Sequence, residues 1–487
     1  MNQEEELNIS QIKKHSIKAV KWSMLAEIVS YSVRPLVLLI LARLLSPADF
    51  GLVGIATVAI GLAQIFQEFG FGKALIQTEN NIDKYANNAF WINISLGLFI
   101  YFLIFITAPY IAEFFDSEQS ILVLRVLCIQ IVLTGFYSVQ FSSMRRNMNF
   151  KSIFIVRFLA AVLPGVLSVL LALFDMGVWS LVYGSLLASL IQAILFWKLS
   201  NWRPTWSFDF VILKKMLIFS RWILLEGLLA WLISWGDSII IGHYLGVNDL
   251  GIYRVGSTLI IFVSSIFFSP IVPIALSYFS RLQSNLRDLQ NSYVKLTQLI
   301  TAFSIPLGIG IALLSKPIVM VFLGEKWIGV EIVISLMAIR LGLGWIVGLN
   351  STVYTAIGKP KLNVGILIIV TAISIPAYIL GAQYGLFIFC LVRLATTLVD
   401  NFLNYMIAKK TLDLPFHYLM KPVFLSLSGT AIMAGVIVLF MKYVSIDNLF
   451  ILILAVMSGI LSYIAALLVI KKDFVFWGYR YGLQILR

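Results

Sequence analysis

The stretch Leu41–Gln77 reads LARLLSPADFGLVGIATVAIGLAQIFQEFGFGKALIQ, and its pattern indicates the type of fold. Two long apolar windows meet in this stretch, near residues 17–44 and 48–72. A helix of about 20 mostly apolar residues is long enough to cross the hydrocarbon core of a bilayer. Each window therefore predicts one transmembrane helix, with a short turn between the two.

The beginning of this stretch recurs 200 residues later in the chain. Ala42–Leu52, ARLLSPADFGL, aligns with Gly242–Ile252, GHYLGVNDLGI, and a leucine, an aspartate and a glycine match in register. Six predicted spans separate the two copies. If the match is a true repeat rather than chance similarity between hydrophobic helices, it predicts two lobes of the same orientation with a cavity between them.

The composition of the whole chain agrees with a membrane protein. Of 487 residues, 60% are hydrophobic and 12% are charged, which lies far outside the range of soluble domains. The polar stretches are too short to form a soluble domain. The formal net charge of +13 is expected from lysines and arginines that fix topology, so nucleic acid is not an expected partner.

The apolar windows predict an all-α polytopic membrane protein with about fourteen transmembrane helices. We expect an N-terminal lobe over residues 1–210, a C-terminal lobe over residues 211–410, and two accessory helices with a tail over residues 411–487. The fourteen predicted spans lie near residues 17–44, 48–72, 86–112, 119–143, 150–173, 177–199, 213–242, 249–276, 293–315, 329–357, 362–381, 384–408, 422–443 and 448–470.

Basic residues gather in alternate loops, which predicts the orientation of the chain. The loops that follow the fourth and sixth spans are basic, whereas the loop that follows the third span is acidic. Loops rich in lysine and arginine stay on the cytoplasmic side. We therefore expect both termini to be cytoplasmic and the number of spans to be even. The residues of these three loops are Arg145, Arg146, Lys151, Lys198, Arg203, Lys214, Lys215, Glu113, Asp116 and Glu118.

Leu41–Gln77 and the basic loop Met144–Phe150 resemble the polysaccharide-export, or Wzx-like, branch of the multidrug/oligosaccharidyl-lipid/polysaccharide transporter superfamily. The resemblance implies two six-helix lobes around a central cavity, plus two C-terminal helices. It also implies a flippase in a bacterial or archaeal cytoplasmic membrane. Such a flippase moves undecaprenyl-diphosphate-linked oligosaccharides from the cytoplasmic to the periplasmic leaflet for polysaccharide export. A polysaccharide polymerase and glycosyltransferases are the partners expected by the same analogy.

Charged residues within the spans are candidates for the transport mechanism, since each costs roughly 2.5–3.5 kcal/mol to insert. Helical spacing places Arg393, Thr397, Asp400 and Asn404 on one face of the twelfth span. Arginines suit the diphosphate, and carboxylates suit ion or proton coupling. The alternative is that these charges form salt bridges that lock helices together. The candidate cavity cations are Arg34, Arg340, Arg393 and Arg254, and the candidate coupling residues are Glu27, Glu226, Asp237 and Asp400.

The sequence contains no catalytic or metal-binding motif. Cys128 and Cys390 lie in predicted helices without metal-ligand spacing, and no phosphate-binding loop is present. We expect neither a cofactor nor a metal site, and no enzymatic activity.

Three other functions remain as alternatives. A peptidoglycan lipid-precursor flippase shares the span count, whereas a multidrug or cation antiporter of the same superfamily generally has twelve spans. A membrane polysaccharide polymerase usually carries a large periplasmic loop, which this sequence lacks.

Overall fold

The computed structural model describes residues 33–68 and 82–486, and these residues form helices without strands. Within these ranges, twelve helices are long and apolar enough to cross a membrane. The prediction of an all-α polytopic membrane protein is therefore confirmed. The predicted first span lies mostly outside the described ranges, and its residues 33–44 are helical.

The predicted tenth span, residues 329–357, is not one continuous helix. It consists of α14 (Val330–Gly344) and α15 (Asn350–Ala356), and residues 345–349 between them are not helical. A Cβ atom at Gly348 would lie 2.5 Å from the ring of Trp345, so the connection folds tightly over that ring. The predicted eighth span also breaks, at Pro270, into α10 (Gly246–Phe268) and α11 (Ile271–Leu282).

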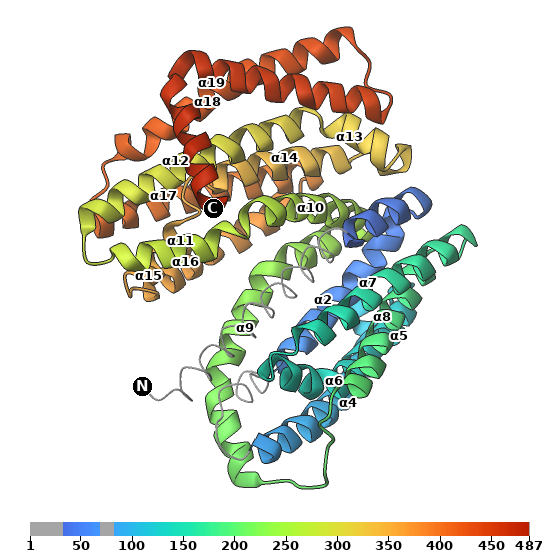
Figure 1. Cartoon of the computed structure of the whole chain (residues 1–487). Helices are drawn as coiled ribbons and strands as arrows, with labels where there is room; N and C mark the ends of the chain where they lie inside the picture. Colours follow the sequence, from blue (N-terminus) through green and yellow to red (C-terminus); the bar gives the residue numbers. More distant parts are fainter. Residues whose placement is uncertain (1–32, 69–81, 487) are drawn as a thin grey trace. The chain divides into compact units, whose positions relative to one another are not determined.

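Contacts divide the chain into two compact units, Met1–Gly251 and Ile252–Arg487. The first unit holds the helix over residues 33–44 and the labelled helices from α2 to α9 (Figure 1). Within it, α7 packs on α8, α6 packs on both α4 and α8, and α2 packs on α5 and α9. The helix bounds are α2 (Pro47–Glu68), α4 (Ile82–Phe114), α5 (Ser120–Leu127), α6 (Ile129–Arg146), α7 (Phe150–Leu173), α8 (Val178–Leu199) and α9 (Phe210–Tyr244).

The second unit is built around α12, which packs on α14 and α18. The pairs α16 with α17, α14 with α17, and α18 with α19 complete it. One of its core clusters includes the buried side chains of Phe279, Tyr293 and Val353. The remaining bounds are α12 (Leu286–Leu313), α13 (Ser315–Phe322), α16 (Lys361–Ala382), α17 (Leu386–Leu412), α18 (Phe416–Tyr443) and α19 (Leu449–Leu486).

The start of α2 shows why the quoted stretch turns where it does. The Asp49 carboxylate accepts hydrogen bonds from the backbone N–H of Ser46 at 2.9 Å and from its hydroxyl at 2.6 Å. Ser46 Oγ in turn accepts from the Asp49 N–H at 3.3 Å, and Pro47 occupies the first helical position. This reciprocal capping ends one span and begins the next. The lobe boundaries after residues 210 and 410 come from the apolar windows and remain predictions.

Candidate functional site

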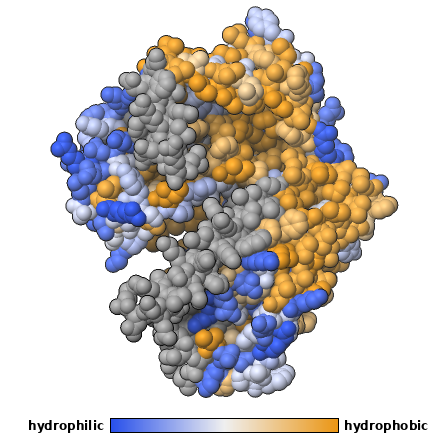
Figure 2. All heavy atoms as spheres, in the orientation of Figure 1, coloured by the Kyte–Doolittle hydropathy of each residue, from blue (hydrophilic) through white to orange (hydrophobic). Residues whose placement is uncertain are grey.

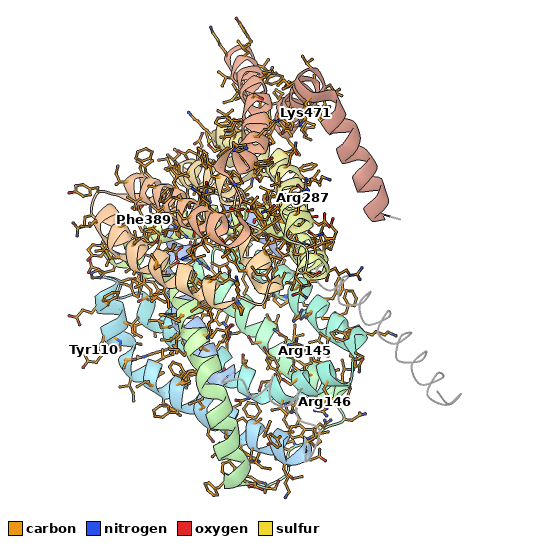
Figure 3. The ribbon with its side chains drawn as sticks, turned by 90° about the vertical axis from the view of Figure 1, so that its left-hand side faces the viewer. Tyr110, Arg145, Arg146, Arg287, Phe389 and Lys471 are labelled. Carbon is orange, nitrogen blue, oxygen red and sulfur yellow. The ribbon has the colours of Figure 1, made fainter. Side chains whose placement is uncertain are left out.

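The two ends of the first unit carry opposite charges. A pocket brings Asp83, at the start of α4, together with Arg146 and Arg203. At the other end of α4, the Phe114 carbonyl lies 2.7 Å from a ring nitrogen of His243, and the acidic loop follows. Figure 3 shows Arg145 and Arg146 together, on the opposite side of this unit from Tyr110. The alternation of loop charge seen in the sequence is thus a separation of charge in space.

At the acidic end, the two copies of the repeat contact each other reciprocally. A Cβ atom at Gly51 would lie 1.9 Å from the Val247 carbonyl oxygen, and one at Gly251 would lie 1.8 Å from that of Pro47. Both pairs are related by the offset of 200 residues. The first turns of α2 and α10 therefore cross backbone to backbone about a local twofold relation, and only glycine allows this approach. We call this contact the glycine crossing; it supports a true repeat.

The candidates of the first unit lie in different environments. Arg34 is exposed on the helix over residues 33–44, and Glu27 lies outside the described residues. Glu226 is exposed on α9, whereas Asp237 on the same helix is buried. The Asp237 carboxylate accepts from the backbone N–H of Ser238 at 2.6 Å and from its hydroxyl at 3.2 Å. These bonds hold one carboxylate oxygen against the helix.

The polar face predicted on α17 contacts α14. Arg340 Nε donates to Thr397 Oγ1 at 3.0 Å, and Thr397 Oγ1 donates to the Arg393 carbonyl at 3.1 Å. One turn further along, Asn404 Nδ2 donates to Asp400 Oδ1 at 2.8 Å. Arg340 also interacts electrostatically with Asp400. The structure therefore brings Arg340 of α14 next to Thr397 and Asp400 of α17, where Arg393 contributes its backbone carbonyl.

Aromatic rings lie against the Arg393 side chain of α17. The Arg393 guanidinium lies over the rings of Tyr253 and Tyr378, in both cases 5.6 Å from the ring centroid. Arg254, the neighbour of Tyr253 on α10, is half-buried. Cation–π contacts of this kind stabilise a guanidinium where little water is present.

Sequence reasoning missed a buried polar cluster at the end of α17. Asn350 Nδ2 and the Tyr354 hydroxyl both donate to the Asn404 carbonyl, at 3.0 and 3.1 Å, and the Tyr293 hydroxyl donates to Asn350 Oδ1. The break between α14 and α15 brings Asn350 to the beginning of α15, next to these groups. Gly344, directly before the break, was the available signal.

An apolar groove of about 610 Å³ lies on the second unit between α12, α18 and α19. Phe303, Ile460 and Ile464 line it, and all three side chains are exposed. The surface of α18 and α19 is mainly hydrophobic (Figure 2). Such a groove suits a hydrocarbon chain and not a sugar.

The side chains that the structure describes include no group of three or more histidine, cysteine, aspartate or glutamate residues able to hold a metal ion. The described site is thus composed of arginines, hydroxyls, amides and carboxylates at membrane depth, together with an apolar groove.

Known proteins share this sequence pattern and this fold. Residues 40–332 match the family model described as polysaccharide biosynthesis protein. The chain is 24% identical to the teichuronic acid biosynthesis protein TuaB of Bacillus subtilis, over 82% of this chain and 84% of TuaB. It is 23% identical to the succinoglycan biosynthesis transport protein ExoT of Rhizobium meliloti, over 66% of each chain.

Among solved structures, the lipid II flippase MurJ in an inward closed conformation superposes with a TM-score of 0.74. The match covers 94% of this chain and 100% of MurJ at 16% sequence identity, which shows a shared fold. These similar proteins are named for teichuronic acid biosynthesis, succinoglycan biosynthesis transport and lipid II flipping, and the chain is a membrane transporter rather than an enzyme. The chain belongs to the polysaccharide biosynthesis protein family, a Wzx-like branch of the multidrug/oligosaccharidyl-lipid/polysaccharide transporter superfamily.

Proposed function

We propose that this protein flips undecaprenyl-diphosphate-linked oligosaccharides from the cytoplasmic to the outer leaflet for polysaccharide export. The second unit carries arginines at membrane depth and a long apolar groove, and this combination is the observation that supports the proposal. Such a lipid has a diphosphate, a polar sugar unit and a long hydrocarbon tail. A drug or a simple cation needs no such combination of sites.

In this proposal, the arginines bind the diphosphate. Arg340 and Arg393 are already held by Thr397 and by two tyrosine rings, so their charges are positioned before the ligand arrives. Arg34 and Arg254 would supply further positive charge. The apolar groove would hold part of the hydrocarbon tail and keep it away from the polar region.

The carboxylates provide the sites proposed for coupling. Asp400 is partnered by Asn404 and interacts with Arg340, so a change in its protonation or ion binding would alter the charge next to a phosphate-binding arginine. Glu27, Glu226 and Asp237 remain candidates on the same reasoning about charge at membrane depth.

The orientation follows from the separation of charge in the first unit. We infer that the basic end faces the cytoplasm and the acidic end faces the outside, with both termini cytoplasmic, in the cytoplasmic membrane of a bacterium or archaeon. The glycine crossing then lies at the outer end. Alternating access would separate α2 from α10 there, and a contact between backbones needs no repacking of large side chains. A polymerase and glycosyltransferases remain the proposed partners.

Complementation tests the proposal. The chain is expressed in a strain that lacks its own polysaccharide flippase, and surface polymer is scored for wild type, Arg340→Ala and Arg393→Ala at equal membrane abundance. The matched control is Arg287→Ala, an exposed arginine of α12. Wild type and the control should restore polymer, and the two cavity variants should not. Full activity of both cavity variants would contradict the proposed role of these arginines.

Two further complementation tests distinguish this function from the related functions. Rescue of a strain that depends on a peptidoglycan-precursor flippase, without rescue of surface polymer, would favour a peptidoglycan lipid precursor as the substrate. Drug resistance without either rescue would favour an antiporter of the same superfamily.

A further inference from the structure

A second polar site lies at the basic end of the first unit. It is a pocket of about 610 Å³, formed by the start of α4, the turn between α6 and α7, and the linker after α8. Among its lining residues are two arginines, four asparagines and a single carboxylate: Arg146, Arg203, Asn87, Asn147, Asn149, Asn201 and Asp83. Its lining is therefore cationic and rich in hydrogen-bonding groups.

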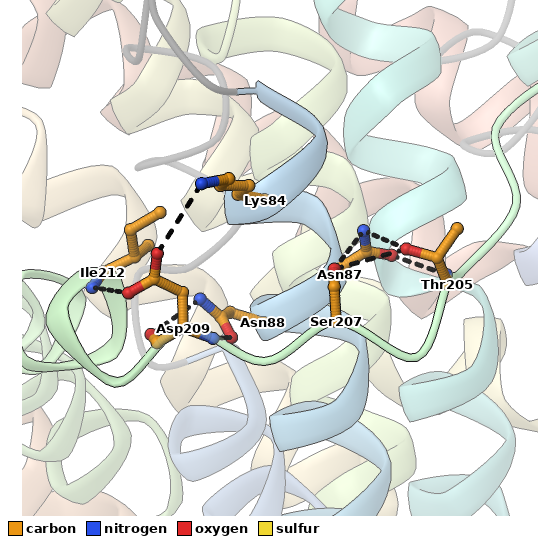
Figure 4. A network of polar contacts seen from close by, with 7 residues as sticks. All are labelled: Lys84, Asn87, Asn88, Thr205, Ser207, Asp209 and Ile212. Carbon is orange, nitrogen blue, oxygen red and sulfur yellow. Dashed lines mark hydrogen bonds and ion pairs between the residues drawn. The ribbon is translucent and has the colours of Figure 1, made fainter.

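One wall of this pocket is held in place by two buried asparagines of α4 (Figure 4). Asn87 Nδ2 donates to Thr205 Oγ1 at 2.7 Å, and Asn87 Oδ1 accepts from the Thr205 N–H at 2.8 Å. Asn88 likewise donates to the Asp209 carbonyl at 3.1 Å and accepts from the Asp209 N–H at 3.0 Å. Lys84 lies 4.0 Å from the Asp209 carboxylate. These bonds fix the linker along α4, so the wall is formed before any ligand binds.

The opposite wall is a fixed turn. The Asn149 N–H donates to the Met144 carbonyl at 2.9 Å, Met148 has a positive φ of 53°, and the Asn149 side chain accepts from the Ser152 N–H at 3.3 Å. This arrangement ends α6 and begins α7 within three residues. Arg146 is half-buried in the last turn of α6, directly before this turn.

Aromatic side chains place the pocket at the level of lipid headgroups. Trp91 stacks on Trp206 with ring centroids 4.2 Å apart, and Trp197 and Trp202 both pack edge-on against Phe90. Tryptophan is enriched at the boundary between hydrocarbon and water. The four tryptophans surround the same helix end that carries the pocket. The ligand therefore meets the pocket at the membrane surface and not deep within the bilayer.

We propose that this pocket binds the phosphate-bearing headgroup of an anionic membrane lipid. Guanidinium groups form paired, charge-assisted hydrogen bonds with phosphate oxygens, and asparagine amides suit the hydroxyls of a headgroup. Two arginines outweigh one aspartate, which leaves a net positive charge to attract the lipid. The proposal does not depend on the proposed function, since the pocket lies in the first unit and the bound lipid need not be transported.

Binding of short-chain phosphatidylglycerol to the purified full-length protein tests this proposal. The variants are Arg146→Gln/Arg203→Gln in the pocket and Arg281→Gln/Arg287→Gln as a control pair of exposed arginines in the second unit. A membrane-surface cation contributes about 1 kcal/mol to binding an anionic lipid, so losing two should weaken binding about 30-fold. The pocket pair should show that loss, the control pair should not, and Arg146→Lys/Arg203→Lys should keep most of the affinity.

Two measurements on the wild type keep the test decisive even if a variant folds poorly. Phosphatidylglycerol affinity should fall as NaCl rises, and zwitterionic phosphatidylcholine should bind much more weakly. Equal binding of the two lipids, or an unchanged affinity in a pocket variant with wild-type melting temperature, would overturn the proposal. Inorganic phosphate that binds as tightly as phosphatidylglycerol would overturn the assignment to a lipid, in favour of a soluble phosphate ester.

Discussion

The glycine crossing leads to a prediction with a magnitude set by the structure. In Gly251→Ala, the new Cβ atom would lie 1.8 Å from the Pro47 carbonyl oxygen and 2.7 Å from its carbon. Ordinary contact needs more than 3 Å, so α2 and α10 must move apart by about 1 Å or more. Overpacking of this kind typically costs about 1–3 kcal/mol. If only the crossed arrangement carries that cost, the equilibrium shifts towards the separated arrangement by about 5- to 160-fold.

Cysteine labelling in intact cells measures that shift. Thr57, on α2, lines a small polar recess of about 190 Å³ in the first unit. In a background without Cys128 and Cys390, a Thr57→Cys variant reports the access of a membrane-impermeant maleimide from outside. Adding Gly251→Ala should raise the labelling rate.

The control for this experiment is Gly435→Ala on α18, where no atom lies within 4 Å of the new Cβ. It should leave the rate unchanged, whereas Gly51→Ala should act like Gly251→Ala because the crossing is reciprocal. If Gly251→Ala labelled at the same rate as Gly435→Ala, the crossing would not be a closing contact.

Three further predictions concern other parts of the molecule. Asn87→Ala removes hydrogen bonds to Thr205 from a buried side chain, so it should destabilise the fold by about 1–3 kcal/mol and lower the melting temperature, whereas exposed Asn147→Ala should not. Arg340→Lys should restore less surface polymer than wild type, because an ammonium cannot reproduce both the bond to Thr397 and a paired phosphate contact. In a transport assay, Ile460→Asp should weaken the competition of a long-chain polyprenyl diphosphate with the substrate more than that of a short-chain analogue. The reason is that this substitution places a charge only in the apolar groove.

Several features of the fold could be predicted from the sequence because they depend on local pattern. The offset of 200 residues predicted a symmetric relation, and the same offset reappears in the contacts of Gly51 and Gly251. The broken tenth span was not predicted, because a hydropathy window averages over α14 and α15 and does not register the tight connection at Gly348.

The same distinction between local pattern and tertiary packing applies to the candidate site. Helical spacing placed Thr397 and Asp400 on one face of α17, and both interact with Arg340 of α14. The roles of Arg393 and Asp400 stay predictions. The partners of that face on α14 and α15 come from tertiary packing that spacing does not determine. The pocket at the basic end was also missed. One of its walls is a linker that Asn87 holds from more than 100 residues away in the sequence.

A flipping assay in proteoliposomes directly tests whether the protein moves a lipid-linked oligosaccharide between the leaflets. A fluorescent oligosaccharide on a polyprenyl diphosphate is placed in both leaflets of vesicles that contain the purified protein, and an impermeant quencher reads the exposed fraction. Without flipping, about half of the lipid is protected, because the bilayer has two leaflets. Wild type should make nearly all of the lipid accessible, and Arg340→Ala should not. Protection equal to that of protein-free vesicles, with the wild-type protein folded and inserted, would refute the proposed flipping.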